Sequence, residues 1–339
     1  MAFQASMAEA LRLTRSGNLM EAAALLRSTL NPGAPRAAPV RAPQNDPIDL
    51  VAERVPEAAR FEEQLYKGSE GAIGYWLYRP AQASAGMPLI VMLHGCTQSP
   101  EDFARGTGMN RLADELGFLV AYPQQSSTAN AQKCWNWFKP GDQQRDKGEP
   151  ALLAAITREV IARHGVDADR VYIAGLSAGG AAAAIMASEY PDLYAAVGVH
   201  SGLACGAARD LPSALSAMKR GGGKAATARG AKRFVPVITF HGDRDTTVHE
   251  VNSREIVAAA TAAAGVPLTV GVDEGSSAGR SYRREASADP QGRVLIERWT
   301  IAGSGHAWSG GDRSGSYADP NGPDASHEMV RFFLERKRA

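Results

Sequence analysis

Cysteine is scarce in this chain of 339 residues, which contains only Cys96, Cys134 and Cys205. Three thiols are too few for a disulfide framework, and their spacing does not match a metal site. Long apolar runs are also missing, because a run such as PLIVML at 88–93 is far shorter than the roughly 20 residues of a membrane-spanning helix. The opening residues, MAFQAS, lack a charged segment followed by an apolar one, so no signal peptide is expected.

An excess of charge of one sign is absent as well. The chain has 37 Lys and Arg against 36 Asp and Glu, a net charge of +1. This balance argues against nucleic acid as the main partner, since phosphate binding needs a basic surface. With 44% hydrophobic and 22% charged residues the composition is that of a globular protein, which excludes disorder and coiled coil for the bulk of the chain.

A helical hairpin is expected at the N terminus, within residues 1–30. Apolar residues recur at helical spacing over 7–30, and Ser16-Gly17-Asn18 interrupts the run. Such a hairpin cannot bury its own apolar face, so we expect it to dock on the main domain or on a partner. The five prolines of residues 31–48 predict an extended linker, and residues 49–339 form the main domain.

Strand and helix patterns alternate through the main domain. Strands are expected at 71–78, 88–93, 118–122, 170–174, 194–199, 235–240 and 293–301. Helices are expected at 109–117, 150–164, 178–190, 251–264 and 324–336. This alternation predicts the α/β class, with a mostly parallel sheet covered by helices on both faces. Residues 203–233 interrupt it and are interpreted as an insertion over the top edge of the sheet, with a solvated basic surface at 219–233.

The strongest chemical signal is Gly175-Leu176-Ser177-Ala178-Gly179, which follows the strand RVYIA and opens a helix. A serine at such a strand–turn–helix bend has its hydroxyl exposed above the sheet, as in the α/β-hydrolase fold. Ser177 is therefore the candidate nucleophile. The same pattern at 275–279 lies between polar segments, and we interpret it as a polar loop.

A serine nucleophile needs a histidine base that is oriented by an acid, and in this fold the acid precedes the histidine along the chain. His306 lies in a glycine-rich loop after a strand and is preferred over His249 and His327. For the acid, Asp243 and Asp245 both follow the strand VPVITF at suitable spacing, and one of them is expected to serve as a turn former.

An oxyanion hole needs two backbone N–H groups. One is expected from Ala178, directly after the nucleophile. The other is expected from Cys96, because His94-Gly95-Cys96 follows the buried strand PLIVML. No metal or cofactor is expected for this chemistry.

Five separated motifs occur in one order along the chain: LHGCTQ at 93–98, CWNW at 134–137, GLSAGG at 175–180, HGDRDTTV at 241–248 and GSGHAW at 303–308. In these motifs the chain resembles the esterase family of poly(3-hydroxybutyrate) depolymerases, to which feruloyl and acetylxylan esterases are similar. The resemblance extends from about residue 49 to the end of the chain. The resemblance implies an α/β-hydrolase fold. The family's triad acid is the aspartate of D-x-x-V, which selects Asp245 over Asp243.

The resemblance also implies a disulfide between Cys96 and Cys134 that braces the oxyanion loop. Trp135, Trp308 and His94 border the catalytic motifs and are candidates for lining the substrate subsites. The missing signal peptide indicates a cytoplasmic location, whereas the family resemblance and the disulfide indicate an extracellular or periplasmic one.

The expected activity is that of a serine esterase that cleaves poly(3-hydroxybutyrate) or short hydroxyalkanoate esters through an acyl-enzyme on Ser177. The alternative is an esterase that removes feruloyl or acetyl groups from carbohydrates, and a serine peptidase is a further one. A different class is a binding module that docks on a partner or polymer through its N-terminal hairpin.

Overall fold

The computed structural model describes residues 2–30, 58–223 and 233–338, and the chain divides into two compact units, Met1–Arg54 and Val55–Ala339. The expected linker at 31–48 and the expected domain start at residue 49 lie outside the described residues. The smaller unit contains α1 (Ala2–Arg15) and α2 (Leu19–Leu30), which pack against each other. Ala10 and Ala22 are buried in this unit, whereas Leu11 and Leu30 are exposed.

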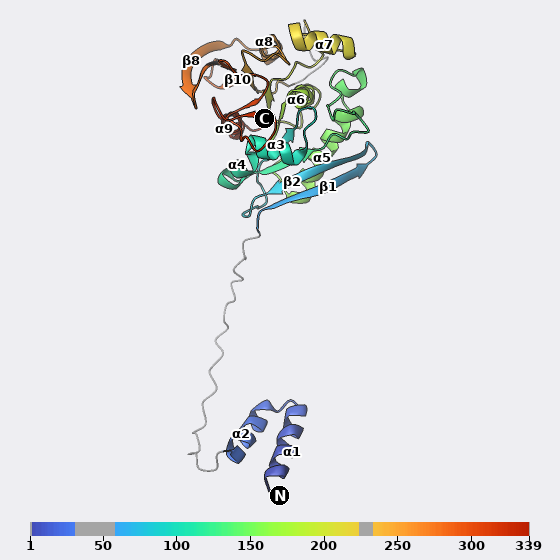
Figure 1. Ribbon diagram of the computed structural model, residues 1–339, viewed down its shortest axis with the longest axis vertical. Helices are drawn as coiled ribbons and strands as arrows, with labels where there is room; N and C mark the ends of the chain where they lie inside the picture. Colours follow the sequence, from blue (N-terminus) through green and yellow to red (C-terminus); the bar gives the residue numbers. More distant parts are fainter. Residues whose placement is uncertain (1, 31–57, 224–232, 339) are drawn as a thin grey trace. The chain divides into compact units, whose positions relative to one another are not determined.

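The larger unit is built on a ten-stranded sheet whose central part is parallel (Figure 1). Its parallel strands, in spatial order, are β4 (Leu119–Pro123), β3 (Leu89–Leu93), β5 (Val171–Leu176), β6 (Ala196–His200), β7 (Val237–Gly242) and β10 (Val294–Ile301). Antiparallel strands add to each edge: β2 (Gly71–Arg79) and β1 (Arg60–Gly68) next to β4, and β9 (Arg280–Ala288) and β8 (Thr269–Ser277) next to β10. The predicted mostly parallel sheet is confirmed.

Helices cover both faces of this sheet, as predicted. One face carries α5 (Gly148–His164), α6 (Ala178–Glu189), α7 (Leu211–Arg220) and α8 (Val251–Ala264). The other carries α3 (Pro100–Thr107), α4 (Met109–Leu116) and α9 (Ala325–Leu334).

Strand β3 shows why an unbroken apolar run marks such a strand. Leu89, Val91 and Leu93 enter the core under α5 and α6, while Ile90 and Met92 enter the core under α3, α4 and α9. All five are fully buried. Each such burial contributes about 1.5–3 kcal/mol, so both faces of the strand must be apolar.

The second serine pentapeptide does not form the polar loop that its sequence indicates. Ser277 ends β8, Ala278 and Gly279 form the turn of a hairpin, and Arg280 begins β9. Both turn residues have positive φ, at 43° and 81°, as a two-residue type I′ turn requires. The hairpin escaped prediction because most β8 side chains are exposed, so the strand has no apolar face to reveal it.

The interrupting stretch 203–233 contains a helix, α7, where no helix was expected. Asp210 caps its N terminus by accepting a hydrogen bond from the Ser213 N–H. The helix buries Ala214 and Ala217 and leaves Lys219 and Arg220 exposed. Residues 224–232 of the expected basic surface lie outside the described residues.

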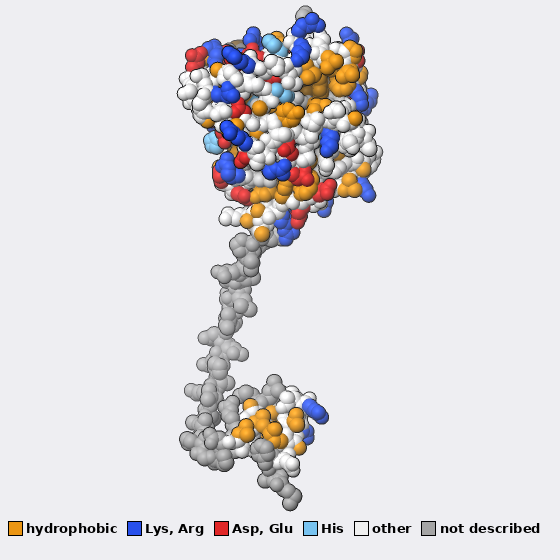
Figure 2. Space-filling view, viewed as in Figure 1, with side chains coloured by type: hydrophobic (Ala, Val, Ile, Leu, Met, Phe, Trp, Pro, Cys, Tyr) orange, Lys and Arg blue, Asp and Glu red, His pale blue; other side chains and the backbone are white. Residues whose placement is uncertain are grey.

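The surface of the larger unit carries charges of both signs. On the face shown in Figure 2, Lys and Arg side chains are interspersed with Asp and Glu. Within the described residues, every helix is too short or too polar to cross a lipid bilayer.

Candidate active site

Ser177 lies at the sharp bend between β5 and α6, with φ 57° and ψ −118°. A non-glycine residue in such a region costs on the order of 1–3 kcal/mol, so its surroundings must enforce it. The Ser177 N–H donates to the His200 carbonyl of β6 at 2.9 Å, and the Ser177 carbonyl accepts from the Ala181 N–H of α6 at 2.9 Å. The strand on one side and the helix on the other therefore hold the serine in place.

Two glycines beside Ser177 permit a close approach of backbone segments. A Cβ atom on Gly179 would lie 2.1 Å from the Leu93 carbonyl oxygen, and one on Gly175 would lie 2.4 Å from the Gly179 carbonyl carbon. Neither contact is sterically allowed, so the G-x-S-x-G pattern is required by packing. The approach brings the loop after β3 against the first turn of α6, beside the serine.

Asp245 and His306 are brought into direct contact. Asp245 follows β7 and His306 follows β10, and these parallel strands are neighbours in the sheet. His306 Nδ1 lies 2.7 Å from Asp245 Oδ2, while Asp245 Oδ1 accepts the N–H groups of Thr247 and Val248, both at 2.9 Å. With its Nδ1 proton donated to the carboxylate, His306 keeps Nε2 free to accept a proton.

The carboxylate of Asp245 is stabilised in its charged form. Burial acts to raise its pKa, but the hydrogen bond and charge of His306 and the Val248 N–H outweigh burial and hold the pKa of Asp245 below its usual value. The side chain is therefore ionised at neutral pH and oriented by two backbone donors. This is the state that an acid partner of a histidine base needs.

The other acid candidate, Asp243, has a different place. Its Oδ1 accepts the Gly303 N–H at 2.7 Å, and the Arg244 N–H donates to the Ser304 carbonyl at 3.0 Å. A Cβ atom on Gly242 would lie 2.2 Å from the same Ser304 oxygen, so the two loops touch through their backbones. Asp243 thus ties the loop that carries His306 to the loop that carries Asp245.

The two expected oxyanion donors are free to bind a ligand. Among the described residues, the N–H groups of Cys96 and Ala178 donate to no protein acceptor. The neighbouring Gly95 N–H is already taken, because Gln98 Oε1 accepts it at 2.9 Å. Sequence reasoning missed this role of Gln98, although the residue belongs to the motif LHGCTQ.

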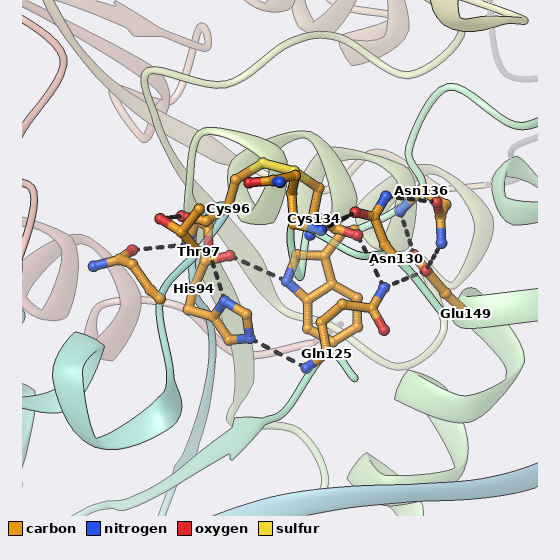
Figure 3. The surroundings of a disulfide bond; sticks show 12 residues. His94, Cys96, Thr97, Gln125, Asn130, Cys134, Asn136 and Glu149 are labelled. Carbon is orange, nitrogen blue, oxygen red and sulfur yellow. Dashed lines mark hydrogen bonds between the residues drawn. A yellow bond between two sulfur atoms is a disulfide. The ribbon is translucent and has the colours of Figure 1, made fainter. Parts of the chain in front are cut away.

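A disulfide joins Cys96 of the oxyanion loop to Cys134, with 4.2 Å between the Cα atoms (Figure 3). The bond spans 38 positions in the sequence. Closing a loop of this length is worth about 4 kcal/mol in the chain-entropy model of disulfide stabilisation. The bond holds the segment that carries the Cys96 N–H against the segment at 130–136. The remaining thiol, Cys205, is free, and burial raises its pKa to about 11.

His94 holds the oxyanion loop in place through hydrogen bonds made within the core. Its Nε2 accepts the Gln125 N–H at 3.2 Å, so Nδ1 carries the proton and donates to the Gly95 carbonyl at 2.7 Å. Burial lowers the pKa of His94 to about 4, which leaves the ring neutral. His94 is 1% exposed and therefore offers no surface to a substrate in this structure, contrary to the prediction.

The two tryptophans predicted to line substrate subsites are also core residues. Trp135 is 0% exposed, and its Nε1 donates to the His94 carbonyl at 3.1 Å. Trp308 is 1% exposed, packs against the rings of Phe103 and His200, and donates to Ser326 Oγ at 3.0 Å. The prediction is therefore wrong for both tryptophans, because each large ring is fully buried. Their side chains instead support the loops that carry Cys96 and His306.

Glu149 lies buried at the start of α5, beside Asn136 and Gln125 (Figure 3). Its oxygens accept three hydrogen bonds, from Gln125 Nε2 at 2.5 Å, the Asn136 N–H at 2.8 Å and Asn136 Nδ2 at 2.6 Å. Burial, together with the nearby Asp142 carboxylate, raises the pKa of Glu149 to about 7 despite these donors.

The raised pKa of Glu149 makes stability depend on pH. Between about pH 4.5 and 7 the folded state binds more protons at this group than the unfolded state, so its contribution to stability falls as pH rises. The full loss above pH 7 is roughly 3 kcal/mol. We expect Glu149→Gln to flatten the pH dependence of the free energy of unfolding across this window, measured by urea titration at several pH values.

Asp142→Asn is the matched variant for this measurement. It removes the neighbouring charge and keeps an oxygen for the Glu149 N–H, which donates to Asp142 Oδ1 at 2.8 Å. The pH window is then expected to move to lower pH. A constant offset between Glu149→Gln and wild type would not bear on the prediction. If the free energy of unfolding of Glu149→Gln changed with pH in the same way as that of the wild type, Glu149 would not be the group with the raised pKa.

The strand order and the three side chains at the carboxyl ends of β5, β7 and β10 define the class of this protein, which has the α/β-hydrolase fold. An acetyl xylan esterase from Aspergillus awamori shares this fold, with a TM-score of 0.63 at 17% identity over 80% of this chain and 99% of that one. The chain belongs to the Esterase PHB depolymerase family, which matches residues 73–273.

Curated relatives agree with this family. Poly(3-hydroxyalkanoate) depolymerase C of Paucimonas lemoignei is 34% identical over 272 residues, which cover 77% of this chain and 64% of that protein. Feruloyl esterase B of Thermothelomyces thermophilus is 34% identical over 143 residues, 42% of this chain and 48% of that one. The chain thus spans about half to two thirds of the length of these two relatives.

Proposed function

We propose that this protein is a serine ester hydrolase that works through an acyl-enzyme on Ser177. The observation that carries the proposal is the 2.7 Å contact between His306 Nδ1 and Asp245 Oδ2, at the same edge of the sheet as the strained serine. A carboxylate in this position fixes the histidine tautomer that can take a proton from a hydroxyl. The comparisons with esterases support the same chemistry.

The reaction proceeds in two halves. Ser177 Oγ attacks the ester carbonyl carbon and passes its proton to His306 Nε2, while the N–H groups of Cys96 and Ala178 stabilise the negative oxygen. The carbon–oxygen bond to the alcohol then breaks, and His306 returns the proton to the departing oxygen. Water attacks the acyl-enzyme with His306 as base, which releases the acid and restores Ser177.

The proposed substrates are poly(3-hydroxybutyrate) and short hydroxyalkanoate esters, as the name of the Paucimonas relative suggests. A pH-stat measures acid release from amorphous poly(3-hydroxybutyrate), with tributyrin as a soluble ester. We expect release from both. Release from tributyrin alone would overturn the polyester substrate and leave the esterase, and release from neither would overturn the hydrolase.

A carbohydrate esterase is the second candidate, favoured by the feruloyl esterase relative and by probable acetylxylan esterase A of Aspergillus clavatus, 27% identical over 218 residues. The same assay with methyl ferulate and acetylated xylan separates the candidates. A higher kcat/KM on these esters than on 3-hydroxybutyrate oligomers would favour the second.

A further inference from the structure

Tyr317 is an exposed aromatic side chain beside the proposed catalytic histidine. Its ring centroid lies 6.4 Å from that of His306, at an interplanar angle of 77°, and the residue is 46% exposed. Within the described residues, its hydroxyl makes no hydrogen bond to the protein. In contrast with the buried Trp135 and Trp308, this ring has both an apolar face and a polar end available to a ligand.

The backbone holds Tyr317 in an unfavourable conformation. Its φ is 51°, in the left-handed region that bulky side chains avoid. The Tyr317 carbonyl accepts the Trp308 N–H at 2.7 Å, and the preceding residue, Ser316, donates its N–H and its hydroxyl to Asp102 of α3 at 2.9 and 2.5 Å. A strained residue that its neighbours fix so firmly, yet whose side chain is half exposed, points to a role in binding.

The loop that presents Tyr317 is joined to the oxyanion loop. Gln98 accepts the Gly95 N–H through Oε1 and donates through Nε2 to the Ser316 carbonyl at 3.0 Å. Gln98 is buried, so this link is shielded from water. The Gln98 side chain therefore links the Tyr317 loop directly to the loop that carries Cys96.

We propose that the Tyr317 ring forms a wall of the subsite for the alcohol part of the ester. The inference rests on the proposed function. His306 returns its proton to the departing alcohol oxygen, so the alcohol part must lie beside the imidazole while that bond breaks. Tyr317 is the exposed ring at that position, and an aromatic wall favours alcohols with an apolar body, such as an aryl alcohol or the next unit of a hydroxyalkanoate chain.

The test compares two esters that share an acyl group, methyl butyrate and benzyl butyrate. For Tyr317→Ala, we expect the ratio of kcat/KM for benzyl to methyl butyrate to fall about tenfold, the size of one lost aromatic contact. Tyr317→Phe should change the ratio less than twofold. Tyr66→Ala, which removes a tyrosine from edge strand β1, is the matched control and should keep the wild-type ratio.

Tyr317 could affect the reaction as a wall of the alcohol subsite or by positioning His306. The breakdown rate of the butyryl-enzyme distinguishes these two roles. The alcohol has already left this intermediate, so a wall of the alcohol subsite should not affect its hydrolysis. Equal losses of kcat/KM on both esters, or slower breakdown of the butyryl-enzyme in Tyr317→Ala, would overturn the inference. Tyr317→Gly relieves the backbone strain and removes the ring, so it gives the same readout if Tyr317→Ala fails to fold.

Failure of the proposed function is distinguishable from failure of this inference. Wild-type protein that hydrolyses neither butyrate ester would overturn the esterase itself. Wild-type protein that hydrolyses both, with an unchanged ratio in Tyr317→Ala, would overturn only the assignment of Tyr317.

Discussion

Ser177→Ala is expected to reduce kcat for tributyrin hydrolysis by at least about 10⁴-fold. The substitution removes the only atom that forms the proposed acyl-enzyme, while the backbone donors of the oxyanion hole stay in place and account for any residual rate. The alanine must adopt the same φ of 57°, so the bend itself is not relieved. Initial rates in a pH-stat measure the effect, and a thermal melt shows that the variant is folded.

The chain supplies its own matched control for this experiment. Ser277 occupies the same position in the second G-x-S-x-G sequence, but it lies in the β8–β9 hairpin. Ser277→Ala is expected to keep wild-type activity. If Ser177→Ala retains more than a few per cent of the activity, the acyl-enzyme mechanism is wrong.

Asp245→Asn is expected to lower kcat by about 10³–10⁴-fold. The amide oxygen of the asparagine would still accept the N–H groups of Thr247 and Val248, so its NH₂ group would face His306 Nδ1. Because an NH₂ group can only donate, His306 would have to accept at Nδ1 and carry its proton on Nε2. In that tautomer the imidazole cannot take the proton of Ser177.

Asp243→Asn distinguishes the two aspartates that their spacing along the chain left open and that only the family resemblance separated. The asparagine oxygen can still accept the Gly303 N–H, so the tie between the two loops persists and kcat should fall less than about tenfold. Asp243→Asn and Asp245→Asn make the same chemical change at positions two residues apart in the sequence. Equal losses in both would remove the distinction between Asp243 and Asp245 and contradict the proposed role of Asp245.

Interior elements were predictable because their residues are selected by burial alone. The runs in β3 and β5 are buried and largely apolar on both faces, which is possible only between two layers of helices. Elements with little buried surface were not predictable: β8 and most of β1 are exposed, and neither carries a clear alternation of apolar and polar residues.

The candidate active site was likewise predictable only in part. The sequence alone identified Ser177 and His306 as candidates, because the chemistry of a hydroxyl nucleophile restricts the residue types and their order along the chain. It did not distinguish core tryptophans from ligand-binding ones, because exposure depends on what packs around a side chain.

What the sequence by itself determined is therefore the class of sheet, the interior strands, and the residue types able to carry the chemistry. Tertiary structure decided which of those residues meet. Asp245 and His306 are 61 positions apart, and Gln98 reaches Ser316 across 218 positions. Contacts of that kind depend on the order of strands and on the backbone approach at Gly179 and Gly242, which local patterns of hydrophobicity do not encode.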